Sequence, residues 1–312
     1  MRRRLICIVI ALLLVVPVGA GLVGHALGPG LLHPMRLNSE RPQQTAEMLK
    51  RSSALKEDFD VRTSDGVELR GWKIHPPSPI DDWVLLFHGV SDNRSGVLGY
   101  AEFLLRDGYS VVMMDSRAHG ESGGEMATYG WQERYDTVAL VNALTSTEKV
   151  SHLYALGVSM GGAIALQSAA VEPRIEGVIA EDPFRDLREV SYDYAGLRFS
   201  PLLGKTLFRP ASIFALRALA QTGGFDPDEV SPEKAVAARP FPVLLICGTR
   251  DTTIPCRHAA YIYRAASGPK ELWVVKGAEH ASALGLAPAE YEDKIVRFLR
   301  ACRNESQSSV ND

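Results

Sequence analysis

Two stretches of the sequence carry the spacing G-x-S-x-G, in which many hydrolases present a nucleophilic serine. One stretch is "GVSMG", centred on Ser159, and the other is "GESGG", centred on Ser122. The spacing alone is weak evidence in a chain that contains 27 glycines. The elements on either side must therefore decide which serine is the candidate nucleophile.

Ser159 has the neighbours that a nucleophile needs. The apolar segment "HLYAL" predicts a buried strand before it, and the predicted helix after it begins at Met160 with two glycines in its first turn. Such glycines allow a sharp turn with close backbone approach, and a helix N-terminus offers N–H groups to developing negative charge. Ser122 follows the loop-like "DSRAHG" and precedes a poor helix start, so we expect it to be a loop residue.

A serine hydroxyl needs a base, and the base needs an orienting acid. His280 lies between a predicted strand and the last predicted helix, where the base stands in the chain order Ser, acid, His. Asp251 follows the predicted strand "PVLLICG" and is the expected acid. Glu181 and Asp182, at the end of the preceding strand, are the alternative acids.

The same chemistry requires two backbone N–H groups that stabilise an oxyanion. One comes from the residue after the nucleophile and the other from the loop after the third strand. These positions are Met160 and Val90, the latter in "FHGVSDN". His88 ends the strand before this loop, and its position suits an oxyanion loop better than a catalytic base.

Apolar segments alternate with helical patterns over most of the chain, which predicts a mainly parallel sheet with helices on both faces. An antiparallel hairpin around Asp65 and Gly66 opens this domain, which we expect to span residues 56–302. A helical insertion at about 184–238 is interpreted as a cap over the C-terminal ends of the strands. The polar tail, residues 303–312, is expected to be disordered.

Five short motifs, in this order, resemble the α/β-hydrolase superfamily: "HGVSDNR", "DSRAHGES", "GVSMGG", "GTRDTTIP" and "GAEH". The most similar branch is the capped one, with monoacylglycerol-lipase-like and serine-aminopeptidase-like proteins. The resemblance covers about residues 57–302. It implies an eight-stranded α/β-hydrolase sheet and hydrolysis of an ester, thioester or amide through an acyl-enzyme. It also implies a structural role for the loop around Ser122.

The predicted function is therefore that of a serine hydrolase that cleaves a small-molecule carboxylic ester or other acyl substrate. One alternative is a serine aminopeptidase or amidase, in which cap acids such as Asp186, Glu189 and Asp193 would hold an ammonium group. Another is a catalytically silent, membrane-anchored binding module. The sequence has no metal-ligand cluster or nucleotide motif, so no metal or cofactor is expected, and a net charge of −3 argues against nucleic-acid binding. The oligomeric state stays open.

The N-terminus begins with three arginines and an apolar run from Leu5 to about Val23. Such a pattern predicts a transmembrane signal anchor or a cleaved signal peptide over residues 1–24, followed by a stalk or linker over 25–55. The arginines would stay in the cytoplasm. The catalytic domain would then lie outside the cytoplasm, anchored to the membrane or secreted if the leader is cleaved.

Three cysteines lie in the predicted domain, namely Cys247, Cys256 and Cys302. An odd set without C-x-x-C spacing indicates neither a zinc cluster nor a disulfide framework. We expect buried free thiols, and a bridge between Cys247 and Cys256 in an oxidising compartment is the alternative.

Overall fold

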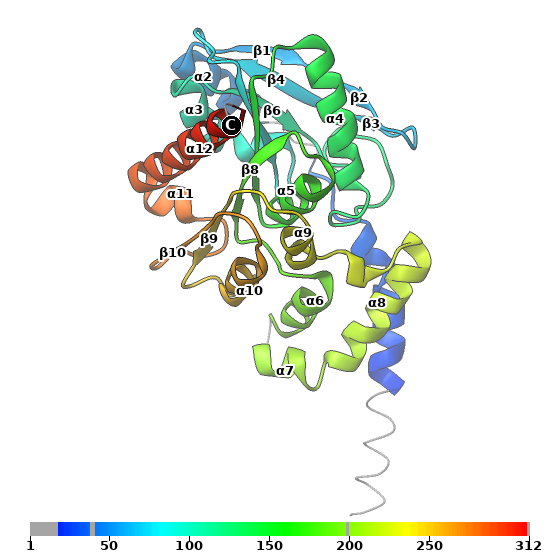
Figure 1. Cartoon of the computed structure of the whole chain (residues 1–312). Helices are drawn as coiled ribbons and strands as arrows, with labels where there is room; N and C mark the ends of the chain where they lie inside the picture. The colour runs from blue at the N-terminus through cyan, green and yellow to red at the C-terminus, as the bar shows by residue number, and fades with distance from the viewer. Residues whose placement is uncertain (1–17, 38–40, 198–199, 311–312) are drawn as a thin grey trace, which may run out of the picture.

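The computed structural model describes residues 18–37, 41–197 and 200–310 (Figure 1). Its centre is an eight-stranded sheet with the strand order β1-β4-β6-β5-β7-β8-β9-β10. The strands are β1 (Leu55–Asp58), β4 (Gly71–His75), β5 (Asp82–Phe87), β6 (Ser110–Met114), β7 (His152–Val158), β8 (Ile175–Glu181), β9 (Val243–Gly248) and β10 (Lys270–Val275). Strands β1, β4 and β6 pair antiparallel, and all pairs from β6 to β10 are parallel. The predicted sheet is confirmed.

Helices cover both faces of this sheet, as Figure 1 shows. Those that pack on one face are α2 (Pro42–Ser52), α3 (Leu98–Arg106), α11 (Ala283–Leu286) and α12 (Pro288–Val310). Those on the other face are α4 (Glu133–Thr147), α5 (Met160–Val171), α9 (Pro232–Ala238) and α10 (Arg257–Ala265). The hairpin β2 (Val61–Arg62) and β3 (Glu68–Leu69) forms a separate small sheet.

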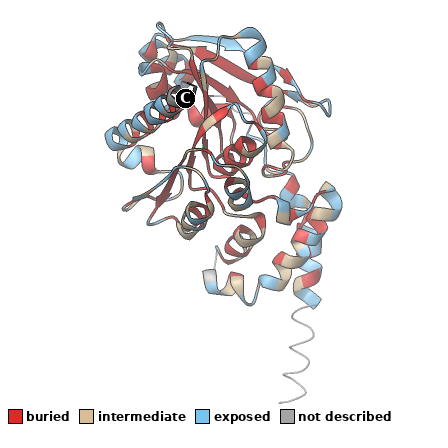
Figure 2. Ribbon diagram, viewed as in Figure 1, coloured by how far each residue is buried: buried red, intermediate tan, exposed pale blue. Residues whose placement is uncertain are grey.

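The central strands are apolar on both faces because both faces are covered. Successive side chains of a strand point to opposite sides of its sheet. In β7, Leu153 and Ala155 therefore join the core on one face, and Tyr154 and Leu156 join the core on the other. Figure 2 shows these strands as buried, with the exposed residues on the outer sides of the helices.

The chain between β8 and β9 is helical, in agreement with the pattern of its sequence. It contains α6 (Leu187–Gly196), α7 (Pro201–Lys205), α8 (Arg209–Gly223), the 3-10 helix η3 (Pro227–Glu229) and α9. Phe184, Leu187 and Leu219 of this segment form an apolar cluster with Ile254 and with Leu32 from the N-terminal part of the chain. The cap thus has a small core of its own, to which the N-terminal segment contributes.

The prediction of a transmembrane signal anchor needs correction. Among the helices of the described residues, none combines the length and the apolar character that a membrane crossing requires. Residues 1–17, on which much of that prediction falls, lie outside the described residues. The described remainder of the apolar run forms a helix over residues 18–27, here called the N-terminal helix, which lies along α8 (Figure 1).

Two further segments differ from expectation. Residues 25–55, predicted as a stalk, contain the 3-10 helix η1 (Pro29–Leu32) and helix α2. Leu32 and Met48 are fully buried there, so a few apolar anchors in a polar segment are enough to hold it against the domain. At the other end, α12 continues to Val310, since the polar tail contains no glycine or proline that would end the helix.

Candidate active site

Ser159 stands between the last residue of β7 and the first residue of α5. Its φ of 57° lies in the left-handed region, which is uncommon for a residue other than glycine. A Cβ atom at Gly157 would lie 2.2 Å from the carbonyl oxygen of Gly161, and one at Gly161 would lie 2.2 Å from that of Phe87. Both glycines of the motif are therefore required for the turn that places Ser159 at the cavity.

The structure brings Ser159, His280 and Asp251 together from distant parts of the chain. The hydroxyl of Ser159 donates to Nε2 of His280 over 2.9 Å, and Nδ1 of His280 donates to Oδ2 of Asp251 over 2.7 Å. A carboxylate can only accept, which places the ring proton on Nδ1 and leaves Nε2 free to accept the serine proton. The arrangement can therefore transfer a proton from the serine to the imidazole.

The loop that carries Asp251 is held at several points. Oδ1 of Asp251 accepts hydrogen bonds from the backbone N–H groups of Thr253 and Ile254, at 2.8 and 2.9 Å. A disulfide joins Cys247, in β9, to Cys256, which precedes α10, so it closes the loop around the acid. The expectation of free thiols at these two positions is wrong, because the turn after β9 brings their Cα atoms within 5.2 Å.

The two alternative acids lie behind the histidine. Asp182 Oδ2 is 3.9 Å from Nδ1 of His280 and accepts a hydrogen bond from the N–H of Ala281, while Oδ1 accepts from Gly248. Burial, together with the neighbouring carboxylates, raises the pKa of Asp182. Asp182 thus fixes the backbone after His280 rather than contacting the imidazole directly.

Glu181 is fully buried and is engaged elsewhere. Its carboxylate accepts hydrogen bonds from the hydroxyls of Tyr100 and Tyr291 and from the N–H of Ala283. Burial raises its pKa, and the two phenol donors oppose that effect. Glu181 therefore anchors the segment after His280 to the core.

The charge of His280 follows from these neighbours. Burial lowers its pKa, but the hydrogen bond from Nδ1 to Asp251 and the negative charges of Asp251 and Asp182 raise it, and the net pKa lies above the ordinary value of 6.5. By contrast, burial lowers the pKa of His88 and brings that of His119 to about 4. Both of these histidines are fully buried and stay neutral at pH 7.

Two backbone N–H groups near Ser159 have no acceptor among the described residues. Val90 and Met160 both line the same cavity as the serine, and neither N–H donates a hydrogen bond to another described residue. Met160 is the first residue of α5, where an N–H has no partner within its own helix. These are the two groups that the sequence nominates for an oxyanion hole.

Ser159 opens into an apolar cavity of about 420 Å³. Leu187 and Val190 of α6 and Leu216 of α8 form its cap side, and Met160 lies beside the serine. In the described part of the chain, none of the residues that line the cavity carries a charge.

Sequence reasoning missed one wall of this cavity, which the N-terminal helix supplies through Val23, Gly24 and Leu27. The turn after that helix adds Leu31. The apolar run gave no sign that it would line the same cavity as Ser159, because burial in a protein pocket and burial in a membrane select the same residue types.

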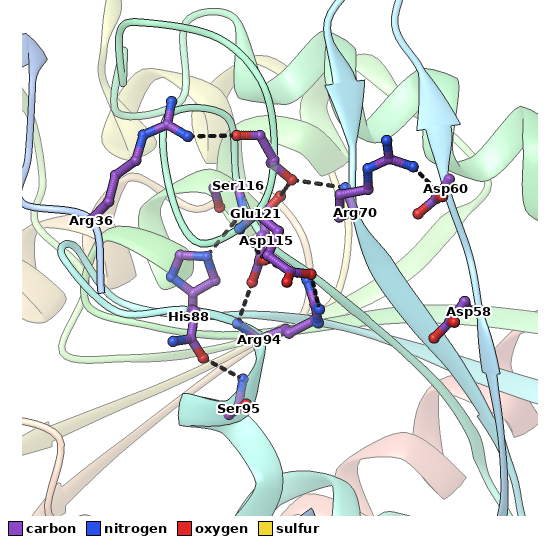
Figure 3. A network of polar contacts seen from close by, with 12 residues as sticks. Arg36, Asp58, Asp60, Arg70, His88, Arg94, Ser95, Asp115, Ser116 and Glu121 are labelled. Atoms are coloured by element: carbon purple, nitrogen blue, oxygen red, sulfur yellow. Dashed lines mark hydrogen bonds and ion pairs between the residues drawn. The ribbon is translucent and has the colours of Figure 1, made fainter. Parts of the chain in front are cut away.

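Ser122 belongs to a buried polar network away from the cavity. Its hydroxyl donates to the carbonyl oxygen of Asp115 over 2.6 Å and accepts from the N–H of Arg70. Figure 3 shows this network, in which Arg94 contacts both Asp115 and Glu121. The hydroxyl of Ser122 is therefore fully engaged in holding the loop.

Comparison with known proteins agrees with this geometry. Residues 78–223 match the family model described as serine aminopeptidase, S33. Among solved structures, the Pyrococcus furiosus esterase Pf2001 superposes with a TM-score of 0.69 and 26% identity, over 86% of this chain and 99% of the esterase. The chain belongs to the α/β-hydrolase superfamily. The matched family model and the similarity to an esterase structure support an enzyme of the hydrolase class.

Two curated relatives are similar over most of their length. The protein YqkD of Bacillus subtilis is 29% identical over 247 residues, which cover 77% of this chain and 78% of the relative. The protein YfhR of Escherichia coli K12 is 26% identical over 256 residues, or 80% of this chain and 82% of the relative. The similarity of the α/β hydrolase to these proteins thus extends well beyond the matched family segment.

Proposed function

We propose that this α/β hydrolase cleaves a carboxylic ester with an apolar acyl group, through an acyl-enzyme formed on Ser159. One observation carries the proposal: the hydroxyl of Ser159 is 2.9 Å from Nε2 of His280 and faces an uncharged cavity of about 420 Å³. The hydrogen bond supplies the base, and the cavity fits an apolar substituent on the carbonyl carbon.

In the proposed reaction, His280 takes the proton of Ser159 as the serine oxygen attacks the ester carbonyl. The N–H groups of Val90 and Met160 stabilise the resulting oxyanion, and one such donor contributes about 3 to 4 kcal/mol to transition-state stabilisation. His280 then protonates the leaving alcohol, which departs and leaves an acyl-serine. Water, deprotonated by His280, attacks the acyl-serine and releases the carboxylic acid.

The acyl group is proposed to be of medium length. One methylene group occupies about as much space as a water molecule, whose share of liquid volume is about 30 Å³. A cavity of about 420 Å³ then holds on the order of a dozen such groups. Burying a methylene stabilises a complex by about 0.8 kcal/mol, so chains that fill the cavity are favoured over acetyl.

The lining of the cavity favours an esterase over an aminopeptidase. An aminopeptidase has to hold a substrate ammonium, which requires a carboxylate near the serine. Asp193 instead pairs with Arg257 and His258, and Glu189 faces Lys205. Asp186 caps α6 and pairs with Arg185. The cap acids are thus committed to contacts outside the cavity.

Labelling with a fluorophosphonate and turnover of a p-nitrophenyl ester test the proposal. We expect Ser159→Ala to abolish both signals, because the probe reacts only with an activated serine. Ser122→Ala, the matched control in the second G-x-S-x-G stretch, should retain turnover and lose only stability. An unlabelled wild-type enzyme would favour the silent binding module, and loss of turnover in Ser122→Ala alone would refute the assignment of Ser159.

We also propose that the domain works outside the cytoplasm. The Cys247–Cys256 disulfide supports this location, because such bonds persist in oxidising compartments and are reduced in most cytosols. Alkylation of free thiols in intact cells, followed by mass spectrometry, tests it: alkylated Cys247 and Cys256 would refute the proposal.

A further inference from the structure

The N-terminal helix forms part of the same cavity as the catalytic serine. Val23 and Gly24 lie four and three residues before Leu27, so they share one face of the helix with it, and all three line the cavity. Leu31, in η1, continues this wall. Leu22 lies on the same helix but is 68% exposed and does not line the cavity.

Two glycines hold this helix close to α8. A Cβ atom at Gly24 would lie 2.0 Å from the carbonyl oxygen of Ala211, and one at Gly28 would lie 2.3 Å from that of Ala215. Both contacts are with backbone atoms, so a larger side chain cannot be accommodated by a rotamer change. By contrast, a Cβ atom at Gly19 would meet none of the described residues within 4 Å.

The segment after the helix is tied to the loop that contains the second G-x-S-x-G stretch. The guanidinium of Arg36, which is labelled in Figure 3, donates to the carbonyl oxygens of Ser122, at 2.8 Å, and of Gly124. Nδ1 of His33 bonds to the carbonyl oxygen of Glu125 over 2.7 Å. These contacts fix the segment that directly follows the cavity-lining residues of the N-terminal helix and η1.

We propose that the N-terminal helix determines which acyl groups the enzyme accepts, with Val23, Leu27 and Leu31 as its contacts to the acyl chain. The inference rests on the proposed esterase function and deepens it. The N-terminal helix packs directly against α8, and α6 and α8 also line the cavity, so the distance between the N-terminal helix and α8 fixes the position of the wall that the acyl chain meets. The Gly24–Ala211 contact is what fixes that distance.

The effect can be measured as a ratio of kcat/KM for two p-nitrophenyl esters, decanoate over acetate. Each methylene that loses its buried position reduces this ratio by about 4-fold. Gly24→Ala pushes the helix away from α8 and opens the wall, so two or more methylenes should become exposed and the ratio should fall by about 10-fold or more. Leu27→Trp narrows the cavity instead, and should move the preferred chain to a shorter length.

Two control variants lie on the same helix and use the same substitutions. Gly19→Ala adds a methyl group in open space, and Leu22→Trp adds an indole on an exposed face outside the cavity. Both should keep the wild-type ratio. All variants are made in the full-length chain, and circular dichroism checks that each is folded. If Gly24→Ala does not fold, Leu27→Trp, at a position that is already 63% exposed, still provides the test.

The outcomes separate this inference from the proposed function. A changed ratio in Gly24→Ala or Leu27→Trp, with wild-type ratios in both controls, supports the inference. Wild-type ratios in all folded variants, with Ser159 still labelled by the fluorophosphonate, would overturn the inference alone. If the wild-type enzyme neither hydrolyses an ester nor becomes labelled, the proposed function fails and the inference fails with it.

Discussion

After the substitution Asp251→Asn, the side-chain amide fits this site in only one orientation. Oδ1 of Asp251 accepts two backbone N–H groups, from Thr253 and Ile254, while Oδ2 faces Nδ1 of His280. Only the amide oxygen of an asparagine can accept, so that oxygen has to take the Oδ1 position and the amide NH₂ has to face the imidazole. An NH₂ group donates, which forces Nδ1 to accept and moves the ring proton to Nε2.

A proton on Nε2 leaves no base for Ser159, even though every heavy atom keeps its place. We expect Asp251→Asn to lower kcat by about 10⁴-fold, the loss that the wrong tautomer causes in a triad of this type. The corresponding increase in the activation free energy is about 5 kcal/mol. Stopped or continuous assay of p-nitrophenyl butyrate hydrolysis measures the change, with the thermal unfolding midpoint as a check that the fold is intact.

Asp182→Asn is the matched control. Asp182 is 3.9 Å from His280 Nδ1 and makes no direct hydrogen bond to it, although it accepts one from Ala281. Removing one backbone hydrogen bond costs about 1 kcal/mol, so kcat should fall by no more than about ten-fold. If Asp251→Asn keeps activity within ten-fold of wild type and Asp182→Asn loses it, the acid has been assigned to the wrong strand end.

Two further predictions concern pH and the disulfide. The pKa of His280 lies above 6.5, and only the neutral ring can accept the serine proton. We therefore expect kcat/KM to fall as the pH is lowered through that pKa, with a midpoint above pH 6.5. A midpoint well below pH 6.5 would contradict the role of the nearby carboxylates. Replacing Cys247 and Cys256 together by alanine should lower the free energy of unfolding by about 2 to 3 kcal/mol, because the disulfide closes a loop with a sequence separation of 9. Urea denaturation measures this change. An unchanged urea midpoint of unfolding would argue against the disulfide.

Much of the fold could be predicted because its signals are local. The strand β7 is apolar at every buried position, and the glycines around Ser159 permit a turn that few other sequences allow. The order of Ser159, Asp251 and His280 along the chain then follows from the order of the strands that carry them. The sequence favours Asp251 over Asp182 as the acid, whereas the contacts between these side chains come from the structure.

The rest depends on contacts between distant segments. Whether residues 18–27 meet lipid or protein is decided by the surface of α8, where Ala211 and Ala215 leave room for Gly24 and Gly28. Similarly, helix α2 is polar over most of its length, and only the burial of Met48 explains why it packs on the domain. The surface against which each of these two segments packs cannot be inferred from the sequence of the segment itself.

The links between the N-terminal segment and the loop after β6 have a practical consequence for protein engineering. Arg36 and His33 bind carbonyl oxygens of the backbone, so these contacts require the loop conformation that the hydroxyl of Ser122 helps to hold, and they do not involve the side chain of Glu125. The wall residues also come from one short, contiguous stretch near the chain terminus. Equivalent stretches from related hydrolases could therefore be grafted as a cassette, which would give chimaeras with altered substrate range on an unchanged catalytic scaffold.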